Sequence, residues 1–323
     1  MARVNPAEKL ARIRAALPEM RAMAAACRVC GRACGVDRTG PAAGYCRAAS
    51  ESGFARCSAA LRHFGEEPML VGRGGSGTVF FSHCNLRCAF CQNHQISHGG
   101  EGREHSTAEL AAAMLRLRDE GAENINLVTP THYALPVLGA LEAAFAAGLD
   151  LPVVWNTNGY DAVELVALLD GIVDVWLPDV KYTEPEAARR YSGAENYPET
   201  ARAAVSAMWR QAGPLLCDSD GTARRGVILR HLVLPEDASG TYAFLLWLQE
   251  EGMTDVTLSL MSQYSPQYRA AEFPEIARSL TPKEYDDAVD FALRLGFGNL
   301  LTQEMESSRV YLPDFKQEEP FRQ

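Results

Sequence analysis

Three cysteines of this sequence are spaced as ligands of a metal cluster would be. Cys84, Cys88 and Cys91 follow the pattern CxxxCxxC directly after a short apolar run at residues 78–82, and the aromatic Phe90 precedes the last of them. Three closely spaced thiolates can hold three corners of a cubane [4Fe-4S] cluster, whereas structural zinc takes four ligands. The spacing therefore predicts an iron-sulfur cluster, with a zinc site or a set of buried thiols as the alternative.

A cluster held by three cysteines leaves its fourth iron without a protein ligand. That iron can bind the amino and carboxylate groups of S-adenosylmethionine (SAM). An electron delivered from the reduced cluster to the sulfonium would cleave SAM and give a 5′-deoxyadenosyl radical. We therefore expect Cys84, Cys88 and Cys91 to be the catalytic cluster ligands.

A second group of four cysteines lies nearer the N-terminus. Its members are Cys27, Cys30, Cys34 and Cys46, and the first two stand in a CxxCG pattern. Four thiolates permit a closed tetrahedral zinc site, and they can equally hold a second [4Fe-4S] cluster. Because eight of the nine cysteines fall between residues 27 and 91 and no export signal precedes them, metal binding is favoured over disulfides.

The elements that must position these residues follow from an alternation of short apolar runs and amphipathic stretches. The predicted strands are residues 78–82, 124–128, 152–156, 173–177, 227–234 and 256–260. The predicted helices are residues 107–120, 135–147, one ending at 169, two flanking 191–198, 242–250 and 282–295, with a further helical stretch at the N-terminus. Such alternation requires parallel strands with helical crossovers, so a barrel-like or doubly wound α/β fold with its site at the carboxyl ends of the strands is expected.

Composition narrows the class of partner. The 323 residues carry a formal net charge of -10, which argues against general binding of nucleic-acid backbones. No apolar run is long enough to span a bilayer, and residues 1–21 lack the apolar core of a signal peptide. A cytoplasmic protein without membrane binding is therefore expected.

The cysteine motif and several further blocks resemble the radical SAM superfamily, specifically the branch similar to pyruvate formate-lyase activating enzyme. The blocks are HFGEEP at 63–68, GGSG at 74–77, NLVTPTHY at 126–133 and RHLVLP at 230–235. The resemblance implies a partial (β/α)6 TIM-like barrel at residues 71–300. A small N-terminal cysteine-rich metal-binding lobe at residues 1–70 would precede the barrel, and a C-terminal tail at residues 301–323 would follow it.

On this resemblance, SAM contacts are expected from polar residues at successive strand ends. Asn156 and Asn158 are similar to the segment that contacts the ribose and carboxylate, and Asp179 with Lys181 resembles the Asp-x-Lys pair of the glycyl-radical activases. The expected cofactor-binding residues are Phe90, Asn93, Thr129, Thr131, His132, Asn156, Asn158, Asp179, Lys181, Arg230 and His231. An ordinary turn at Asn158 and a simple salt bridge between Asp179 and Lys181 are the alternatives.

One block departs from the family pattern. The Gly-Gly-Glu element that binds the SAM amino group in the superfamily is absent, and Thr129-Pro-Thr-His132 occupies its place. Hydroxyls, backbone carbonyls or His132 would then bind that amino group, or His132 would be packed and hydrogen-bonded. Arg230 and His231 lie in an apolar strand and would contact SAM or substrate, or form a structural ion pair.

The resemblance implies an oxidoreductase that abstracts a hydrogen atom from a peptide, protein or small molecule. Activation of a glycyl-radical enzyme is the alternative within this class, and a noncatalytic iron-sulfur electron carrier or metal-binding protein is the alternative of another class. SAM and a low-potential electron donor such as flavodoxin or ferredoxin are the expected partners.

Overall fold

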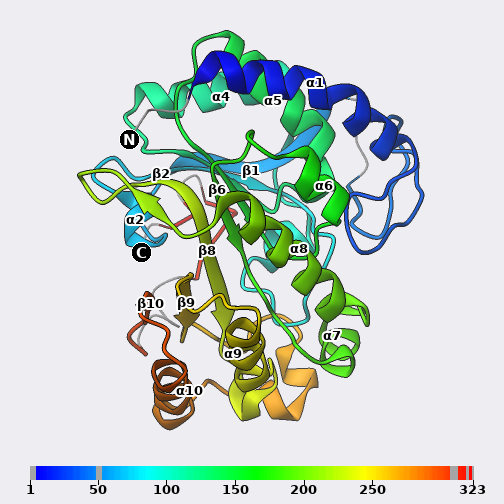
Figure 1. Cartoon of the computed structure of the whole chain (residues 1–323). Helices are drawn as coiled ribbons and strands as arrows, with labels where there is room; N and C mark the ends of the chain where they lie inside the picture. The colour runs from blue at the N-terminus through cyan, green and yellow to red at the C-terminus, as the bar shows by residue number, and fades with distance from the viewer. Residues whose placement is uncertain (1–4, 49–52, 306–311, 318–319, 322–323) are drawn as a thin grey trace.

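A sheet with parallel central strands forms the middle of the computed structural model, which describes residues 5–48, 53–305, 312–317 and 320–321 (Figure 1). The parallel strands are β2 (Ser76–Phe81), β4 (Ile125–Val128), β5 (Val153–Thr157), β6 (Val175–Pro178), β8 (Ala223–Leu232) and β9 (Thr257–Met261). Each pairs with the next in this order. The α/β fold with a parallel sheet, predicted from the alternation, is therefore confirmed.

The sheet is open at both edges. At one edge β1 (Phe54–His63) runs antiparallel to β2 and to β3 (Arg103–Ser106). At the other edge β10 (Leu300–Leu301) runs parallel to β9, and the short β7 (Leu216–Cys217) pairs with β8. Within the described residues the strand order runs from β10 to β3 without joining the ends, so the sheet does not close and the predicted partial TIM-like barrel is not confirmed.

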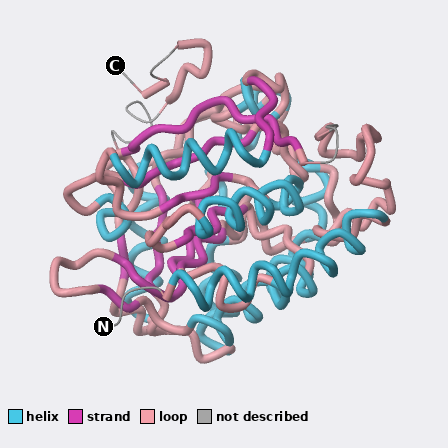
Figure 2. Tube along the Cα trace, turned by 90° about the horizontal axis from the view of Figure 1, so that it is seen from above, coloured by secondary structure: helices cyan, strands magenta, loops and turns pink. Residues whose placement is uncertain are grey.

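Helices connect the parallel strands and run alongside them (Figure 2). They are α4 (Thr107–Asp119), α5 (Ala134–Ala146), α6 (Val163–Leu168), α7 (Pro185–Ser192), α8 (Tyr197–Ala212), α9 (Thr241–Glu250) and α10 (Pro282–Arg294), with the short α2 (Pro68–Val71) and α3 (His94–Ser97) near the start of the sheet. Capping boxes fix where two of them begin: Ser106 pairs with Glu109 at α4, and Thr281 with Glu284 at α10. None of the described helices has the length and apolar character to cross a membrane.

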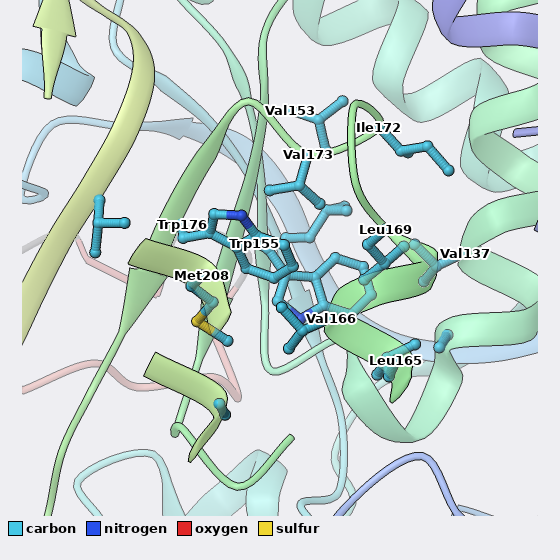
Figure 3. Packing of buried hydrophobic residues seen from close by; sticks show 14 of the residues in the cluster. Val137, Val153, Trp155, Leu165, Val166, Leu169, Ile172, Val173, Trp176 and Met208 are labelled. Carbon is cyan, nitrogen blue, oxygen red and sulfur yellow. The ribbon is translucent and has the colours of Figure 1, made fainter. Parts of the chain in front are cut away.

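Strand alternation sorts side chains between the helix-covered face and the interior of the curved sheet. Trp155 and Trp176 point to the helices, where they pack with Leu165, Val166, Leu169 and Met208 (Figure 3). Because successive strand residues face opposite sides, the neighbours of these tryptophans face the interior. The side chains of Val154 and Leu177 pack in this interior. Asn156 belongs to the same inner face and brings a polar group to the carboxyl end of β5.

The N-terminal segment is not set apart as the expected lobe. Helix α1 (Pro6–Ala25) packs against α5 (Figure 1). The buried Lys9 forms an ion pair with Asp174, next to β6. Cys27 and Cys46 belong to the main hydrophobic core. The separate cysteine-rich lobe is therefore not confirmed, because strand β1 and helix α1 join this segment to the sheet and its helices.

Candidate functional site

A cavity of about 520 Å³ opens at the carboxyl edge of the parallel strands. The side chains of Cys84, Cys88 and Cys91 line it together with residues from β2, β4, β5, β8 and β9 and from the segment that follows β6. Strand ends of a parallel sheet meet at one edge, so residues far apart in the chain converge here. The cavity is therefore the place where the sequence motif meets the rest of the fold.

The loop that carries Cys84, Cys88 and Cys91, called the cysteine loop below, directly follows β2 and lines the cavity. His83 and Arg87 adopt left-handed backbone conformations, with φ of 68° and 59°. The loop is held by backbone hydrogen bonds from His83 N to Ile96 O (2.8 Å) and from Ala89 N to Tyr191 O (2.7 Å). These contacts fix its path, and so fix which way its thiols face.

Polar groups surround the thiols of this loop. The amide of Leu86 and the Nδ2 of Asn158 each lie 3.4 Å from Cys84 Sγ, and the Ser97 hydroxyl lies 3.1 Å from Cys91 Sγ. Asn158 Nδ2 also donates to Asn85 Oδ1 at 2.7 Å. Donors directed at sulfur stabilise a thiolate, which is the form of cysteine that binds iron.

Burial works in the opposite direction on these thiols. It raises the pKa of Cys84 and, with the neighbouring Cys88, raises the pKa of Cys91 to about 12. The Cys84 and Cys91 thiols therefore keep their protons at neutral pH unless a cationic centre displaces them. Buried polar atoms without a hydrogen-bond partner also gather near the loop: His83 Nδ1, Arg87 Nε and His94 Nδ1. Unpaired N–H donors such as Arg87 Nε suit a bound group that offers hydrogen-bond acceptors.

A network of buried charges lies on the cavity wall away from the helices. Arg230 Nε donates to Asp179 Oδ1 (2.7 Å), Nη2 to Asn156 Oδ1 (2.7 Å) and Nη1 to Glu66 Oε2 (3.2 Å). Lys181 Nζ binds the other carboxylate oxygen of Asp179 at 2.8 Å. Burial alone would raise the pKa of Asp179, but Arg230 and Lys181 outweigh it and lower that pKa. Asp179 is therefore ionised and held by two cations.

Glu66 and Glu67 are site residues that the sequence analysis did not assign. They lie between β1 and α2, ahead of the first parallel strand, and both line the cavity. Their side chains are 9% exposed, and Glu67 Oε2 lies 3.7 Å from Arg230 Nη1. The HFGEEP block does not indicate this, because glutamate side chains are mostly exposed and the partner that buries these two, Arg230, is far away in the sequence.

The C-terminal segment supplies another part of the wall. Phe321 lines the cavity and its ring lies 4.2 Å from that of His63, centroid to centroid. Phe315 packs on Phe80 of β2, and its backbone amide donates to Gln95 Oε1 at 2.7 Å. Described residues of the predicted tail thus belong to the site. The polar and aromatic composition of the tail did not indicate this.

The structure brings most of the predicted cofactor-binding residues to this one cavity. Those that line it are Phe90, Asn93, Thr129, Asn156, Asn158, Asp179, Lys181 and Arg230. Thr131, His132 and His231 do not line it. The polar strand ends expected to act together therefore do converge, with three exceptions.

Two of the exceptions arise from a change of direction after β4. Thr129 has a left-handed backbone (φ 56°), and the following 3-10 turn, Thr131–Tyr133, carries the chain away from the cavity. The Thr131 hydroxyl donates to the buried Asp161 at 2.6 Å, and His132 Nε2 lies 2.9 Å from Ser82 O. Burial lowers the pKa of His132 to about 3, so this histidine is a neutral, packed side chain.

The third exception follows from strand alternation. Because Arg230 points into the interior, His231 points to the helices, where its ring stacks on Phe244 with centroids 4.4 Å apart. Its Nδ1 lies 2.8 Å from Val180 O and its Nε2 lies 2.9 Å from the Thr241 hydroxyl. Both nitrogens are occupied, which makes His231 a structural residue of β8.

Comparison with known proteins identifies the chain at the level of its superfamily. A model of the radical SAM superfamily matches residues 78–210. The uncharacterized protein MJ0674 of Methanocaldococcus jannaschii is 32% identical over 275 residues, which are 82% of this chain and 74% of that protein. The chain belongs to the radical SAM superfamily. The branch similar to pyruvate formate-lyase activating enzyme is not confirmed and stays a prediction.

Two solved structures of other proteins also match this radical SAM chain. Methylornithine synthase (PylB) matches with 16% identity and a TM-score of 0.43, over 68% of this chain and 61% of that one. HydG, a maturase of the [FeFe]-hydrogenase, matches with 15% identity and a TM-score of 0.47, over 71% and 52%. The chain spans less than two thirds of the length of either structure.

Membership of the radical SAM superfamily implies a [4Fe-4S] cluster and SAM, and it supports SAM-dependent radical chemistry. Among the described residues, no three His, Cys, Asp or Glu side chains are grouped as ligands of a single metal ion. A cubane places each cysteine on its own iron, so its ligands stand farther apart than those of one ion. The three thiols that line one cavity and the unpartnered polar atoms around the loop fit such a group.

The segment that carries the four N-terminal cysteines of this radical SAM chain packs against the residues that follow β5. Residues 29–31 pair with the segment after β5: Cys30 forms a bridge with Asp161, and Gly31 N donates to Tyr160 O. Arg38 Nη1 lies 2.9 Å from Cys46 Sγ. Zinc or a second cluster at Cys27, Cys30, Cys34 and Cys46 is not confirmed and stays a prediction.

Arg32, in the same N-terminal segment, ties the cysteine loop to the helix layer. Its guanidinium donates to the carbonyls of Asn85 (3.1 Å), Ser192 (2.9 Å) and Gly193, and it stacks on the Tyr45 ring at 3.7 Å from the centroid. A planar fork with several donors can hold several carbonyls at once. Arg32 is therefore a positioning residue for the loop.

We expect Arg32→Lys to loosen the cysteine loop. A lysine ammonium cannot reproduce the fork, so the unfolding free energy should fall by about 1–2 kcal/mol. A cluster held on the loop should also pass to an iron chelator faster under anaerobic conditions. Urea unfolding and the rate of iron release measure the two effects. Arg28→Lys, an exposed substitution in the same segment, is the control, and equal behaviour of the two variants would contradict the positioning role.

Proposed function

We propose that the protein is an enzyme that reductively cleaves SAM at a [4Fe-4S] cluster on Cys84, Cys88 and Cys91. It would then abstract a hydrogen atom from a substrate in the cavity. The observation that carries the proposal is that all three thiols line one cavity together with the polar ends of the neighbouring strands. When bound, the cluster and SAM supply the electron transfer and the 5′-deoxyadenosyl radical.

The chain's own residues would orient SAM and keep water out. Asn158 lies beside Cys84, so its amide is placed to meet a polar group next to the cluster. Lys181 faces the same space, and its ammonium suits a carboxylate. Phe90 packs edge-on against Tyr182 and Tyr264, which supports the loop with an apolar layer. These groups would position the sulfonium and shield the reactive site.

The proposal is tested by SAM cleavage under anaerobic conditions. The purified chain is reconstituted with iron and sulfide, mixed with SAM and dithionite, and analysed for 5′-deoxyadenosine by chromatography and mass spectrometry. We expect 5′-deoxyadenosine to form in a cluster-dependent reaction. An intact cluster without 5′-deoxyadenosine would instead support the noncatalytic electron carrier.

The substrate is a separate question from SAM cleavage. The open edges of the sheet leave room for a polypeptide, which is compatible with the activase prediction. The cavity, however, carries charged side chains that a glycine residue alone would not require. A peptide, protein or small molecule with a charged group is therefore the proposed substrate, and a flavodoxin or ferredoxin is the proposed electron donor.

A further inference from the structure

Arginine side chains gather around the cysteine loop, although the chain as a whole is acidic. The sequence contains 31 Lys and Arg residues against 41 Asp and Glu residues. The loop and the short helix α3 span residues 83–101, and three segments that contact them are residues 45–48, 53–57 and 268–272. The charged residues of these four ranges are Arg47, Arg56, Arg87 and Arg269 against Glu101 and Glu272. The charge around the loop is therefore opposite in sign to that of the whole chain.

Two of these arginines lie next to an exposed aromatic ring. The Arg87 guanidinium lies 5.6 Å from the centroid of the Tyr45 ring, and Tyr45 is 41% exposed. Arg47 follows Tyr45 by two residues and is itself exposed. Burial lowers the pKa of His83, a residue of the loop, and the nearby charges of Arg56, Arg47 and Arg87 lower it further. All three arginines therefore lie around the same part of the loop.

Tyr268 and Arg269 lie against another part of the loop. The backbone amide of Arg269 donates to Ala89 O at 2.9 Å. Tyr268 is 46% exposed, and the His98 ring lies against its ring with the centroids 4.5 Å apart. His98 Nε2 in turn lies 3.0 Å from Cys88 O. A short series of contacts, from Tyr268 through His98 to Cys88, thus leads from solvent to an expected cluster ligand.

Most of these arginines are not explained as stabilising ion pairs. Arg269 does pair with Glu272 at 2.6 Å, but both side chains are about half exposed. Arg47, Arg56 and Arg87 form no ion pair with any residue that the structure describes. Charges at the surface contribute little to folding even when they are paired, and like charges repel one another. The cations therefore stay available to a partner that carries negative charge.

The composition of this surface suits a small protein interface. Arg and Tyr are among the residue types that are enriched at protein interfaces and that carry most of their binding energy. Here the two types alternate, with Tyr45 near Arg47 and Tyr268 next to Arg269. Complexes that form only for electron transfer are small and transient, so a few charges and two exposed rings can hold one.

We propose that Tyr45, Arg47, Arg87, Tyr268 and Arg269 form a docking surface for an acidic, low-potential redox protein, called the donor surface below. The inference rests on the proposed function and refines it, because it assigns the electron donor to one face of the molecule. The donor would be oxidised by one electron and the cluster reduced by one, with no bond made or broken. Since the chain carries a net charge of -10, most of its surface repels an acidic donor, which is steered to this cationic part.

The test measures binding, which needs no turnover. The anaerobic, cluster-loaded protein is titrated calorimetrically with oxidised flavodoxin, an acidic redox protein, at low and at physiological ionic strength. The same flavodoxin, once reduced, is then mixed with the protein in a stopped-flow instrument, and the visible absorption of the cluster reports the rate of its reduction. The donor-surface variant carries Arg47→Glu and Arg269→Glu together.

The control variant carries Arg73→Glu and Arg12→Glu, which change the net charge by the same amount. Arg73 is exposed and precedes β2, so it lies at the end of that strand opposite to the cysteine loop. Arg12 lies on α1 and is paired with Glu8, as Arg269 is paired with Glu272. Iron content and visible absorption show whether each variant holds its cluster.

We expect wild-type binding of flavodoxin to weaken by about 10-fold between low and physiological ionic strength. At low ionic strength the donor-surface variant should bind about 10-fold more weakly than the wild type, and its cluster should be reduced correspondingly more slowly. The control variant should stay within about 2-fold of the wild type. Equal binding by the two variants would overturn the proposal. Wild-type binding that is absent, or that does not respond to salt, would overturn it without any variant.

Failure of the proposed function would look different. A wild-type chain that binds flavodoxin through the donor surface, yet forms no 5′-deoxyadenosine, would keep the docking surface and reject the radical chemistry. A wild-type chain that cleaves SAM with dithionite, while the donor-surface variant binds flavodoxin as the control does, would keep the chemistry and reject the docking surface.

Discussion

Replacement of Cys88 by alanine is expected to abolish SAM cleavage. Cys88 is buried, and its thiol lines the cavity together with those of Cys84 and Cys91. A cubane that loses one of three protein ligands exposes a second iron and is held by two bonds only. We expect the variant to retain little iron after anaerobic reconstitution and to form no more 5′-deoxyadenosine than a protein-free mixture.

The control for this variant is Cys217→Ala. Cys217 lies in β7, away from the residues that line the cavity, so its loss should leave iron content and SAM cleavage unchanged. Iron and sulfide analysis, the visible absorption of the cluster and the 5′-deoxyadenosine assay give the readouts. If Cys88→Ala still cleaved SAM at the wild-type rate, the cluster assignment would be wrong.

The sequence predicted the central strands well because their composition leaves little choice. Residues 152–156 and 173–177 were predicted as strands, and the structure places β5 at Val153–Thr157 and β6 at Val175–Pro178. Both are short, entirely buried strands that begin with apolar residues, Val153–Trp155 in β5 and Val175–Leu177 in β6. Parallel strands covered on both faces take this composition, so local sequence and final burial agree.

Strand β1 was missed for the opposite reason. Phe54–His63 contains arginines, a serine and a cysteine, and its burial pattern is irregular, with a bulge between Cys57 and Ala59. Neither the strand period nor an apolar run stands out in such a segment. Its strand structure depends on pairing with β2 and β3, which no local window of sequence contains. The cysteine-rich segment was therefore separated from the sheet that it adjoins.

Some residues of the candidate site could be predicted from the sequence, and others could not. Residues at the carboxyl ends of parallel strands could be grouped in advance, since topology alone brings Asn156, Asp179 and Arg230 to one edge. The direction of the chain after β4 could not be predicted, because it depends on the left-handed backbone of Thr129. Nor could the position of Glu67, which reaches the cavity from a segment outside the parallel strands. Tertiary packing, and no local pattern, decides both.

Glu67, which lines the cavity, makes the folding stability depend on pH. Burial raises its pKa from 4.5 to about 7, so the unfolded chain releases this proton at a lower pH than the folded protein does. Between these values the folded state binds more protons, and folding stability falls as the pH rises. Above pH 7 the full deficit is present, on the order of 3 kcal/mol at 1.36 kcal/mol per pKa unit.

Glu67→Gln should therefore stabilise the protein at pH 8, by up to about 3 kcal/mol, and by less than about 1 kcal/mol at pH 5. Arg230 keeps Asp179 and Glu66 as partners in this variant, so no buried cation is left alone. Urea unfolding at the two pH values measures this difference in stability. Glu19→Gln, on the exposed face of α1, is the control. A variant less stable than the wild type at pH 8 would mean that Glu67 is an ionised partner of Arg230 with a structural role. A more stable variant would mean that the burial of the Glu67 carboxylate is a cost that the folded protein bears.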